Sequence, residues 1–415
     1  MRFATTIIIG AGQSGLAMSK HLTARSIDHV VLERGEVANS WRSERWDSLR
    51  LLTPNWQSRL PGYAYEGDNP DGYMTMPEVV GYLERYAETS GTPVQCSTSV
   101  KRVHRIHTGY EVTTDRGLWR CRTLVLASGA CNAATIPALA AGLPRHLASH
   151  TPMEYRNPDA LRVGGVMIVG ASASGMQLAR EIHASGRRVV LSVGEHVRMP
   201  RVYRGSDILW WMNVTGMMDV RYDAIEDLDR ARRLPSLQLI GTPERITIDL
   251  NTLSKAGVEI VGRLVSLRDG KAQFSGSLEN HCSLADLKMN RLLASIDDWT
   301  RMTGQEEMLP NTGRPEPTEI PAGTPLGLDL NDRTISTVIW ATGYRPEYGW
   351  LDVPVLDRKG RIRHDGGIVD SPGLYVIGLP FMRRRKSSFI DGAGDDAADL
   401  AEHLHTYLGS QRAAA

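Results

Sequence analysis

The stretch TIIIGAGQSG, residues 6–15, decides the fold. Its apolar start is typical of a strand buried on both faces, and its three glycines have G-x-G-x-x-G spacing. Residues 16–24 then have helical periodicity, and residues 29–32 form a second apolar run that is followed by Glu33. A glycine turn between strand and helix, with an acid roughly 20 positions later, is the fingerprint of a dinucleotide-binding β-α-β unit.

The same unit occurs a second time. Residues 166–169 form an apolar run, GASASG follows at 170–175, and a helical segment leads to another apolar run at 188–191. Two such units predict an α/β fold with two Rossmann-like dinucleotide-binding domains. Further apolar runs at 124–127, 338–341 and 373–377 predict strands, and 392–408 predicts a closing helix.

The order of these segments predicts how the domains are connected. If the C-terminal strand rejoins the first sheet, the first domain is discontinuous and comprises residues 1–155 and 325–415. The second domain, residues 156–324, is then inserted into it.

Composition excludes several classes of protein. A formal net charge of +1 over 415 residues provides no field to attract nucleic acid. The four cysteines form no Cys-x-x-Cys pair, and no metal site is indicated. No run approaches the roughly 20 apolar residues of a membrane span, and the N-terminus has no signal-peptide pattern. We expect a cytoplasmic monomer or homodimer that acts on a small molecule and has no nucleic-acid or membrane partner.

The two glycine loops differ in a way that indicates two different nucleotides. In the first loop, Glu33 offers a carboxylate to a free ribose hydroxyl, which suits FAD or NAD. Aligning VVLS with VVLE places Ser192 opposite Glu33, so the second unit lacks this carboxylate. Arg198 and Arg201 follow, and guanidinium groups can bind a 2′-phosphate. The second nucleotide is therefore predicted to be NADPH, although the nearby Glu195 leaves NADH open.

Ser172 replaces the middle glycine of the second loop, where its hydroxyl could bond a phosphate. It could instead be a nucleophile, but that motif is G-x-S-x-G, and Ser174 stands at its last position. No aspartate and histidine can be assigned as its partners, so we do not favour a hydrolase.

Several further segments carry a resemblance to a known family. They are SWR at 40–42, RWDSLRLLTPN at 45–55, GASASGM at 170–176, ATGY at 341–344, and the tail GLPFMRRRKSSFIDGAGDDA at 378–397. Together with the tandem loops, they make the chain resemble the class B flavoprotein monooxygenases, most closely their flavin-containing type. One departure is the linker signature F-x-G-x-x-x-H-x-x-x-(Y/W), of which only Tyr155 matches.

The resemblance implies FAD at the first loop and NADPH at the second. The implied reaction is hydride transfer to the flavin, formation of a flavin C4a-hydroperoxide with O2, and oxygenation of a nitrogen, sulfur or aromatic centre of a small substrate. It also implies a role for Asn55 as the polar catalytic group.

The residues expected to contact each cofactor follow from the motifs and the resemblance. For FAD they are Gly10, Gly12, Gln13, Ser14, Gly15, Glu33, Arg34, Ser40, Trp41, Arg42, Thr53, Val100, Ser128, Gly129, Asp391 and Gly392. For NADPH they are Gly170, Ser172, Ser174, Gly175, Ser192, Arg198, Arg201, Ala341, Thr342 and Gly343.

Two alternatives remain open at this point. The chain could be an FAD-dependent NADPH reductase or oxidase that inserts no oxygen atom. It could also be a non-catalytic, nucleotide-binding redox sensor.

Overall fold

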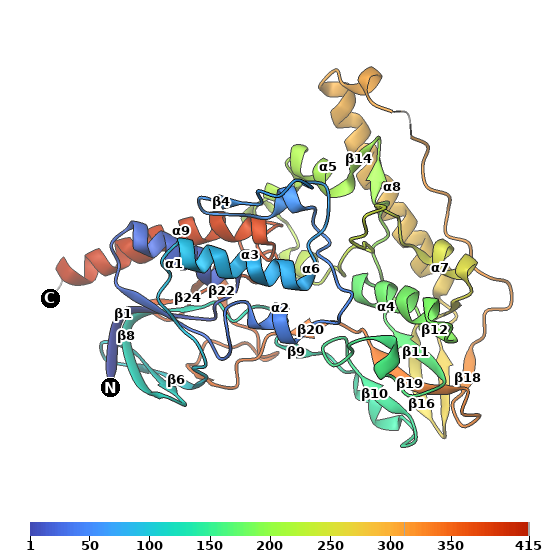
Figure 1. Ribbon diagram of the computed structural model, residues 1–415, viewed down its shortest axis with the longest axis horizontal. Coiled ribbons are helices and arrows are strands. Elements are labelled where there is room, and N and C mark those ends of the chain that lie inside the picture. Colours follow the sequence, from blue (N-terminus) through green and yellow to red (C-terminus); the bar gives the residue numbers. More distant parts are fainter. Residues whose placement is uncertain (311, 414–415) are drawn as a thin grey trace.

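The computed structural model describes residues 1–310 and 312–413. It has two large sheets whose central strands run parallel, and each sheet has a glycine loop at the end of a central strand (Figure 1). The predicted α/β fold with two Rossmann-like units is confirmed.

The first sheet is built around β1, which pairs in parallel with β2 and β8. Its remaining strands extend both edges, and β24 from the C-terminal segment pairs with β8 as predicted. Its strands are β1 (Arg2–Ile9), β2 (His29–Leu32), β5 (Val94–Gln95), β6 (Val100–Ile106), β7 (Gly109–Thr114), β8 (Gly117–Leu126), β21 (Leu351–Asp352), β22 (His364–Asp365), β23 (Ile368–Val369) and β24 (Leu374–Val376).

Helices α1, α3 and α9 lie together over the first sheet (Figure 1). Apolar residues of these helices pack in one core with those of β1, β2 and β8. The helices of this part are α1 (Gln13–Ala24), the short α2 (Asn39–Ser43), α3 (Met76–Thr89) and α9 (Ile390–Ala413), and a small hairpin is formed by β3 (Arg59–Leu60) and β4 (Tyr63–Ala64). The closing helix thus begins at Ile390, close to its predicted start.

The second sheet is entirely parallel, in the order β10-β19-β11-β12-β15. Its two faces are covered differently. Successive residues of β11 and β12 point to opposite faces of the sheet. Those on one face pack against α4 and α7, and those on the other face pack against the small sheet β16-β17-β18. The strands are β10 (Ala148–His150), β11 (Gly165–Val169), β12 (Val189–Ser192), β15 (Glu259–Val261), β16 (Leu264–Arg268), β17 (Lys271–Phe274), β18 (Gly327–Asp329) and β19 (Ile335–Trp340).

A third group of elements borders the second sheet. It contains a buried apolar cluster formed by α5 and the long α8. The elements of this group and the helices of the second sheet are β13 (Val202–Tyr203), β14 (Ser206–Asp207), α4 (Ala173–Ala184), α5 (Ile208–Val214), α6 (Leu228–Arg232), α7 (Leu250–Ala256) and α8 (Leu278–Met302). No helix of the described residues is both long and apolar enough to cross a membrane.

The predicted domain boundaries need correction. β10 pairs with β19, and β19 pairs with β11 at the centre of the second sheet. The chain therefore enters the second sheet before residue 155 and leaves it after residue 325, near residue 340. A sequence pattern shows that a run is buried but not which sheet buries it, which is why the boundaries were misplaced.

The two connections between the sheets run side by side. β9 (Ala133–Ala134) on the outward connection pairs antiparallel with β20 (Tyr344–Arg345) on the return. The N–H of Thr135 also donates to the carbonyl of Gly343 at 2.9 Å.

Candidate cofactor-binding site

The first glycine loop has the geometry that a bound phosphate requires. Gly10 has φ +110°, and a Cβ there would lie 2.5 Å from the carbonyl oxygen of Ala127. A Cβ on Gly15 would lie 1.9 Å from the carbonyl oxygen of Gly10. Gly12, at the start of α1, instead faces open space, because a Cβ there would meet no atom within 4 Å. The exposed N–H groups of the first turn can thus meet an anion closely.

The second loop repeats this geometry. Gly170 has φ +107°, its Cβ position lies 2.4 Å from the carbonyl oxygen of Ala341, and that of Gly175 lies 1.8 Å from the Gly170 carbonyl oxygen. Ser172 takes the place of Gly12 with nearly the same backbone, φ −82° and ψ −173°. Its side chain does not cap the helix. The N–H groups at the start of α4 therefore remain free of a side-chain partner, as a second anion site requires.

Glu33 is buried at the end of β2 and organises the first loop. One carboxylate oxygen accepts from the N–H of Ala11 at 2.8 Å, and the other accepts from the N–H of Gly35 at 3.0 Å. Each oxygen keeps a further lone pair, so Glu33 can also accept from a ribose hydroxyl.

The residue that matches Glu33 in the second unit is Val193, not Ser192. Gly10 donates to the carbonyl of Leu32, while Gly170 donates to that of Ser192. Hence Ser192 corresponds to Leu32, one position earlier than the sequence alignment suggested. The Ser192 side chain is also buried, and its hydroxyl donates to Gly262 O at 3.0 Å and accepts from the N–H of Leu264 at 2.9 Å. The prediction that Ser192 contacts the nucleotide is wrong.

Arg198 and Arg201 are also not phosphate ligands. Arg198 is buried between Asp249 and Asp286, at 2.6 and 2.8 Å. Arg201 is 0% exposed and pairs with Asp207 at 2.6 Å. A phosphate could reach either guanidinium only by breaking a buried ion pair, which is costly. The sequence showed the arginines but not their partners, so this prediction is wrong.

Arg201 instead joins distant segments of the chain. Its Nη1 donates to the carbonyl of Leu52 at 2.8 Å, and its guanidinium lies 4.5 Å from the ring centre of Tyr73. The Tyr73 hydroxyl donates to Asp207 at 2.8 Å. This cluster of Arg201, Asp207 and Tyr73 fixes the segment that contains Leu52 and, next to it, the predicted flavin contact Thr53. Asp207 follows Arg201 by six positions, which was the only signal available in the sequence.

Residues 46–49 bind the first part of the chain to the second. Trp46 packs in the core of the second sheet, and the Ser48 hydroxyl donates to Glu181 on α4 at 2.6 Å. Tyr155, the one matching residue of the linker signature, is buried and donates to Glu181 at 3.2 Å. Burial raises the pKa of the Glu181 carboxyl.

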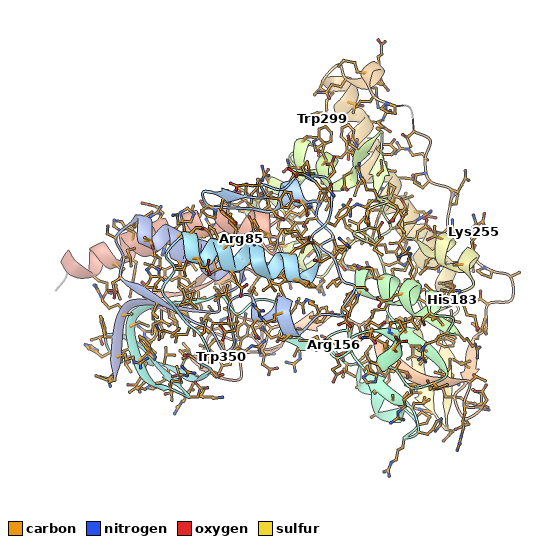
Figure 2. All side chains as sticks on the ribbon, in the orientation of Figure 1. Arg85, Arg156, His183, Lys255, Trp299 and Trp350 are labelled. Atoms are coloured by element: carbon orange, nitrogen blue, oxygen red, sulfur yellow. The ribbon has the colours of Figure 1, made fainter. Side chains whose placement is uncertain are left out.

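Arg156 holds the same junction and was missed in the sequence. It lies where the two parts of the molecule meet (Figure 2). Its guanidinium donates to the carbonyls of Ser43 at 2.7 Å and Arg45 at 3.1 Å. The Trp41 ring N–H in the neighbouring helix α2 points to the Gln13 side chain at 3.4 Å, which places one predicted flavin contact against the first loop.

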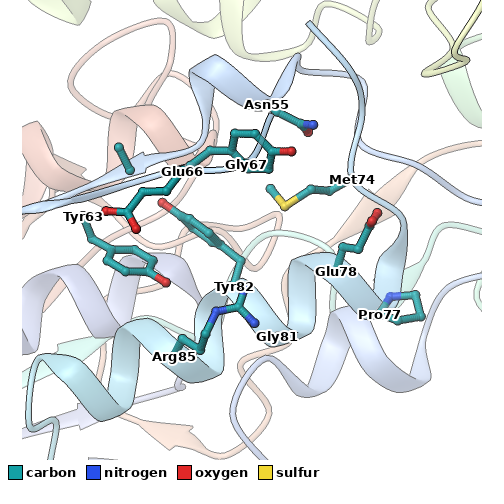
Figure 3. Close-up of a pocket in the computed structure, with 12 residues that line it drawn as sticks. Asn55, Tyr63, Glu66, Gly67, Met74, Pro77, Glu78, Gly81, Tyr82 and Arg85 are labelled. Atoms are coloured by element: carbon teal, nitrogen blue, oxygen red, sulfur yellow. The ribbon is translucent and has the colours of Figure 1, made fainter. Parts of the chain in front are cut away.

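Asn55 lies at a different place from the glycine loops. It lines a pocket of about 500 Å³ between the β3–β4 hairpin and α3 (Figure 3). The Asn55 amide donates to the carbonyl of Asn69 at 2.9 Å, and its buried Oδ1 has no partner within the described residues. The lining residues are Asn55, Tyr63, Ala64, Tyr65, Glu66, Gly67, Met74, Pro77, Glu78, Gly81, Tyr82 and Arg85. None of them except Asn55 was predicted as a site residue.

The turn that starts at Asn55 contains an unusual group of unpartnered polar atoms. Both side-chain polar atoms of Gln57 and the hydroxyl of Ser58 are buried without a hydrogen bond within the described chain, like Oδ1 of Asn55. Buried polar groups are normally satisfied, so this turn lacks a polar partner. The polar atoms of a flavin ring are a suitable one, and the open space at Gly12 fits its diphosphate. The chain therefore fits FAD.

At the C-terminal end, the predicted contacts at 391–392 are already engaged. Asp391 forms a two-point ion pair with Arg59, at 2.8 and 3.1 Å. The N–H of Gly392 donates to Phe389 O at 3.2 Å, and a Cβ on Gly392 would lie 1.9 Å from the Lys386 carbonyl oxygen. Gly392 thus allows close packing here, and its N–H is not free for a cofactor.

The remaining predicted contacts lie around the two loops. Ser128 and Gly129 follow β8, as Thr342 and Gly343 follow β19, so each pair flanks its glycine loop. Arg34 and Arg42 are exposed and pair with Glu44 and Glu84. These assignments, with Ser40, Thr53 and Val100, stay predictions.

Comparison with known proteins agrees with this geometry. Residues 7–210 match the family model of the pyridine nucleotide-disulphide oxidoreductases. An oxidoreductase described as CzcO-like from Geobacillus kaustophilus is 30% identical over 96% of this chain and 97% of its own length. The indole-3-pyruvate monooxygenase YUCCA8 of rice is 26% identical over 96% of this chain and 90% of its own. The solved structure of a flavin-containing monooxygenase from Stenotrophomonas maltophilia has the same fold, with a TM-score of 0.68 and 18% identity, and covers 98% of this chain and 100% of that one.

Proposed function

The chain belongs to the family of CzcO-like oxidoreductases, and on this premise we propose that it is an FAD-dependent monooxygenase that uses NADPH and O2 to oxygenate a small organic substrate. It is an enzyme, and its motifs, relatives and fold are those of class B flavoprotein monooxygenases. The family assignment removes the non-catalytic redox sensor from consideration.

One observation carries the proposal. The chain has two equivalent nucleotide loops, but only the first has a carboxylate, Glu33, at the end of the adjoining strand, whereas Val193 stands at that place in the second. A carboxylate there binds a ribose with free hydroxyls, and its absence admits a 2′-phosphate. This difference supports FAD at the first loop and NADPH at the second.

The protein's own residues would bind and shield the cofactors. The starts of α1 and α4 each present free N–H groups to a diphosphate. Bound FAD would supply the redox chemistry, by accepting a hydride from NADPH and activating O2. The Asn55 amide is held by Asn69 O, so its Oδ1 is positioned to accept a hydrogen bond from a cofactor or substrate. The segment 46–52, anchored by the buried Trp46 and Leu51, would keep water from the junction of the two parts.

The test measures where the electrons of NADPH go. Purified protein loaded with FAD is reduced by NADPH without oxygen, then mixed with 18O2 and a panel containing an amine, a thioether, an indole acid and a ketone. We expect a product that carries one 18O atom for at least one member of the panel. If all electrons appear as hydrogen peroxide across the panel, the chain is a reductase or oxidase and the proposal is wrong.

A matched pair of variants tests the flavin site. Replacing Glu33 with Gln removes the charged acceptor at the first loop, and we expect the FAD content of the purified protein to fall. Glu36→Gln, an exposed neighbour, should leave it unchanged. Equal FAD content in the two variants would contradict the assignment of Glu33.

A further inference from the structure

The residue that takes the place of Glu33 at the end of β12 carries no charge that would repel a phosphorylated ribose. Val193, which takes the place of Glu33, is apolar and 0% exposed. The next residue, Gly194, has no side chain, and Arg198 and Arg201 are neutralised within the core. Whatever recognises the second nucleotide at this edge must therefore come from other elements.

Arg263 comes from one such element, and its side chain lies directly over Gly194. It follows β15, which pairs in parallel with β12, so both strands end at the same edge. A Cβ on Gly194 would lie 3.7 Å from both Cγ and Cδ of Arg263. Arg263 is exposed, and no acid within the described residues pairs with it. A guanidinium without a carboxylate partner at this edge is available to a phosphate.

Lys288 on α8 brings a second cation to the same edge. Its ammonium lies 2.9 Å from Oε1 of Glu195, the residue after Gly194. The pair is open to solvent, since the Glu195 side chain is 62% exposed, and ion pairs this exposed contribute little. Lys288 can therefore exchange Glu195 for a more highly charged partner at little cost.

The charges around Glu195 are mainly positive. The hydrogen bond from Lys288 lowers the pKa of Glu195, and the nearby charges of His281 and Arg230 act in the same direction. The Glu195 carboxylate opposes an incoming anion at this point, and Lys288 partly neutralises it.

We propose that Arg263 and Lys288 bind the 2′-phosphate of NADPH and that Glu195 limits its affinity. The proposal rests on the proposed function in one respect, the use of a nicotinamide dinucleotide at the second loop. It replaces Arg198 and Arg201 with two residues whose charges are accessible.

The experiment uses adenosine fragments, so it needs neither flavin nor turnover. Binding of adenosine 2′,5′-bisphosphate and of 5′-AMP to the full chain is measured by titration calorimetry. We expect the wild type to prefer the bisphosphate, and Arg263→Gln and Lys288→Met each to weaken it by roughly tenfold or more, as for loss of a charged hydrogen bond. The affinity for 5′-AMP should stay within about twofold, because a phosphate contact removed at the 2′ position leaves the rest of the site intact.

Two further variants make the result specific. Arg268→Gln, an exposed arginine at the far end of β16, is the matched control and should change neither affinity. Glu195→Gln should tighten the bisphosphate alone, a gain that misfolding cannot produce. Equal wild-type affinities for the two fragments, equal losses for both fragments in Arg263→Gln, or a loss in Arg268→Gln would overturn the proposal. Preference for the bisphosphate in a protein that forms no 18O product would leave the proposal standing and reject the monooxygenase function alone.

Discussion

Replacing Asp207 with Asn should destabilise the protein far more than loss of one hydrogen bond would. In the wild type, Asp207 accepts from Nε and Nη2 of Arg201 at 2.8 and 2.6 Å and from the Tyr73 hydroxyl at 2.8 Å. Arg201 is 0% exposed, so the variant leaves a positive charge in the core without a counter-charge. Breaking a buried pair in this way costs about 3–5 kcal/mol.

The choice of Asn keeps the helix-capping role of this side chain while it removes the charge and the acceptor that faces Arg201. Asp207 also caps α5, because its Oδ1 accepts from the N–H of Leu209 at 2.8 Å. Asn is an equally good cap, so this contribution is kept. Asp223→Asn is the control, since its pair with Arg221 is about half exposed on both sides and should contribute little to stability.

Urea unfolding followed by tryptophan fluorescence measures both variants. Trp211, one of nine tryptophans that contribute to the signal, is buried in the same cluster as Ile208 and Leu209, beside Asp207. A loss in Asp207→Asn within about 1 kcal/mol of that in Asp223→Asn would refute the reasoning, because it would mean that Arg201 is hydrated or neutralised elsewhere. A double variant, Arg201→Met with Asp207→Asn, should regain part of the loss, since the unpaired charge is then gone.

Three other predictions concern the loops and two titrating groups. Gly10→Ala should lower the melting temperature, because its Cβ would meet Ala127 O at 2.5 Å. Gly12→Ala should leave the melting temperature nearly unchanged and lower the FAD content. A larger loss of thermal stability in Gly12→Ala than in Gly10→Ala would contradict the assigned geometry. Burial lowers the pKa of His364 to about 4, and Gly367 N–H donates to its ring, so stability present above pH 6.5 should fall by up to about 3 kcal/mol as the pH drops toward 4. His364→Gln should flatten this profile in acid unfolding curves, and an unchanged slope would show that His364 is not responsible. Burial raises the pKa of Glu181, so its stabilising contribution is complete below pH 4.5 and is lost as the pH rises. The stability of Glu181→Gln relative to wild type should therefore increase from pH 4.5 upward. A difference in stability that does not change with pH would reject the raised pKa.

The local structure of the two loops could be predicted from sequence because it depends on neighbours along the chain. Gly10 and Gly170 need left-handed backbone, and Gly15 and Gly175 need close contact with the preceding turn, so glycine spacing alone determines both. Glu33 was found for the same reason, since it directly follows an apolar strand.

The errors concern contacts between segments that are distant in sequence. The partners of Arg198, Asp249 and Asp286, lie far along the chain, and no periodicity relates them. The Ser192 alignment matched letters, whereas the strand register with β11 shows that Val193 holds the place of Glu33. β19 was recognised as a strand, but its membership of the second sheet depends on pairing that one sequence does not show.

The paired connections β9 and β20 also limit how the two sheets can move. A single linker could twist freely, but here any rotation must be taken up by two strands that share hydrogen bonds, including the one from Thr135 to Gly343. A rotation that pulled the two strands apart would break those bonds, so both connections resist it together. The two nucleotide loops are therefore joined by a double connection, and any change in their relative orientation has to deform β9 and β20 together.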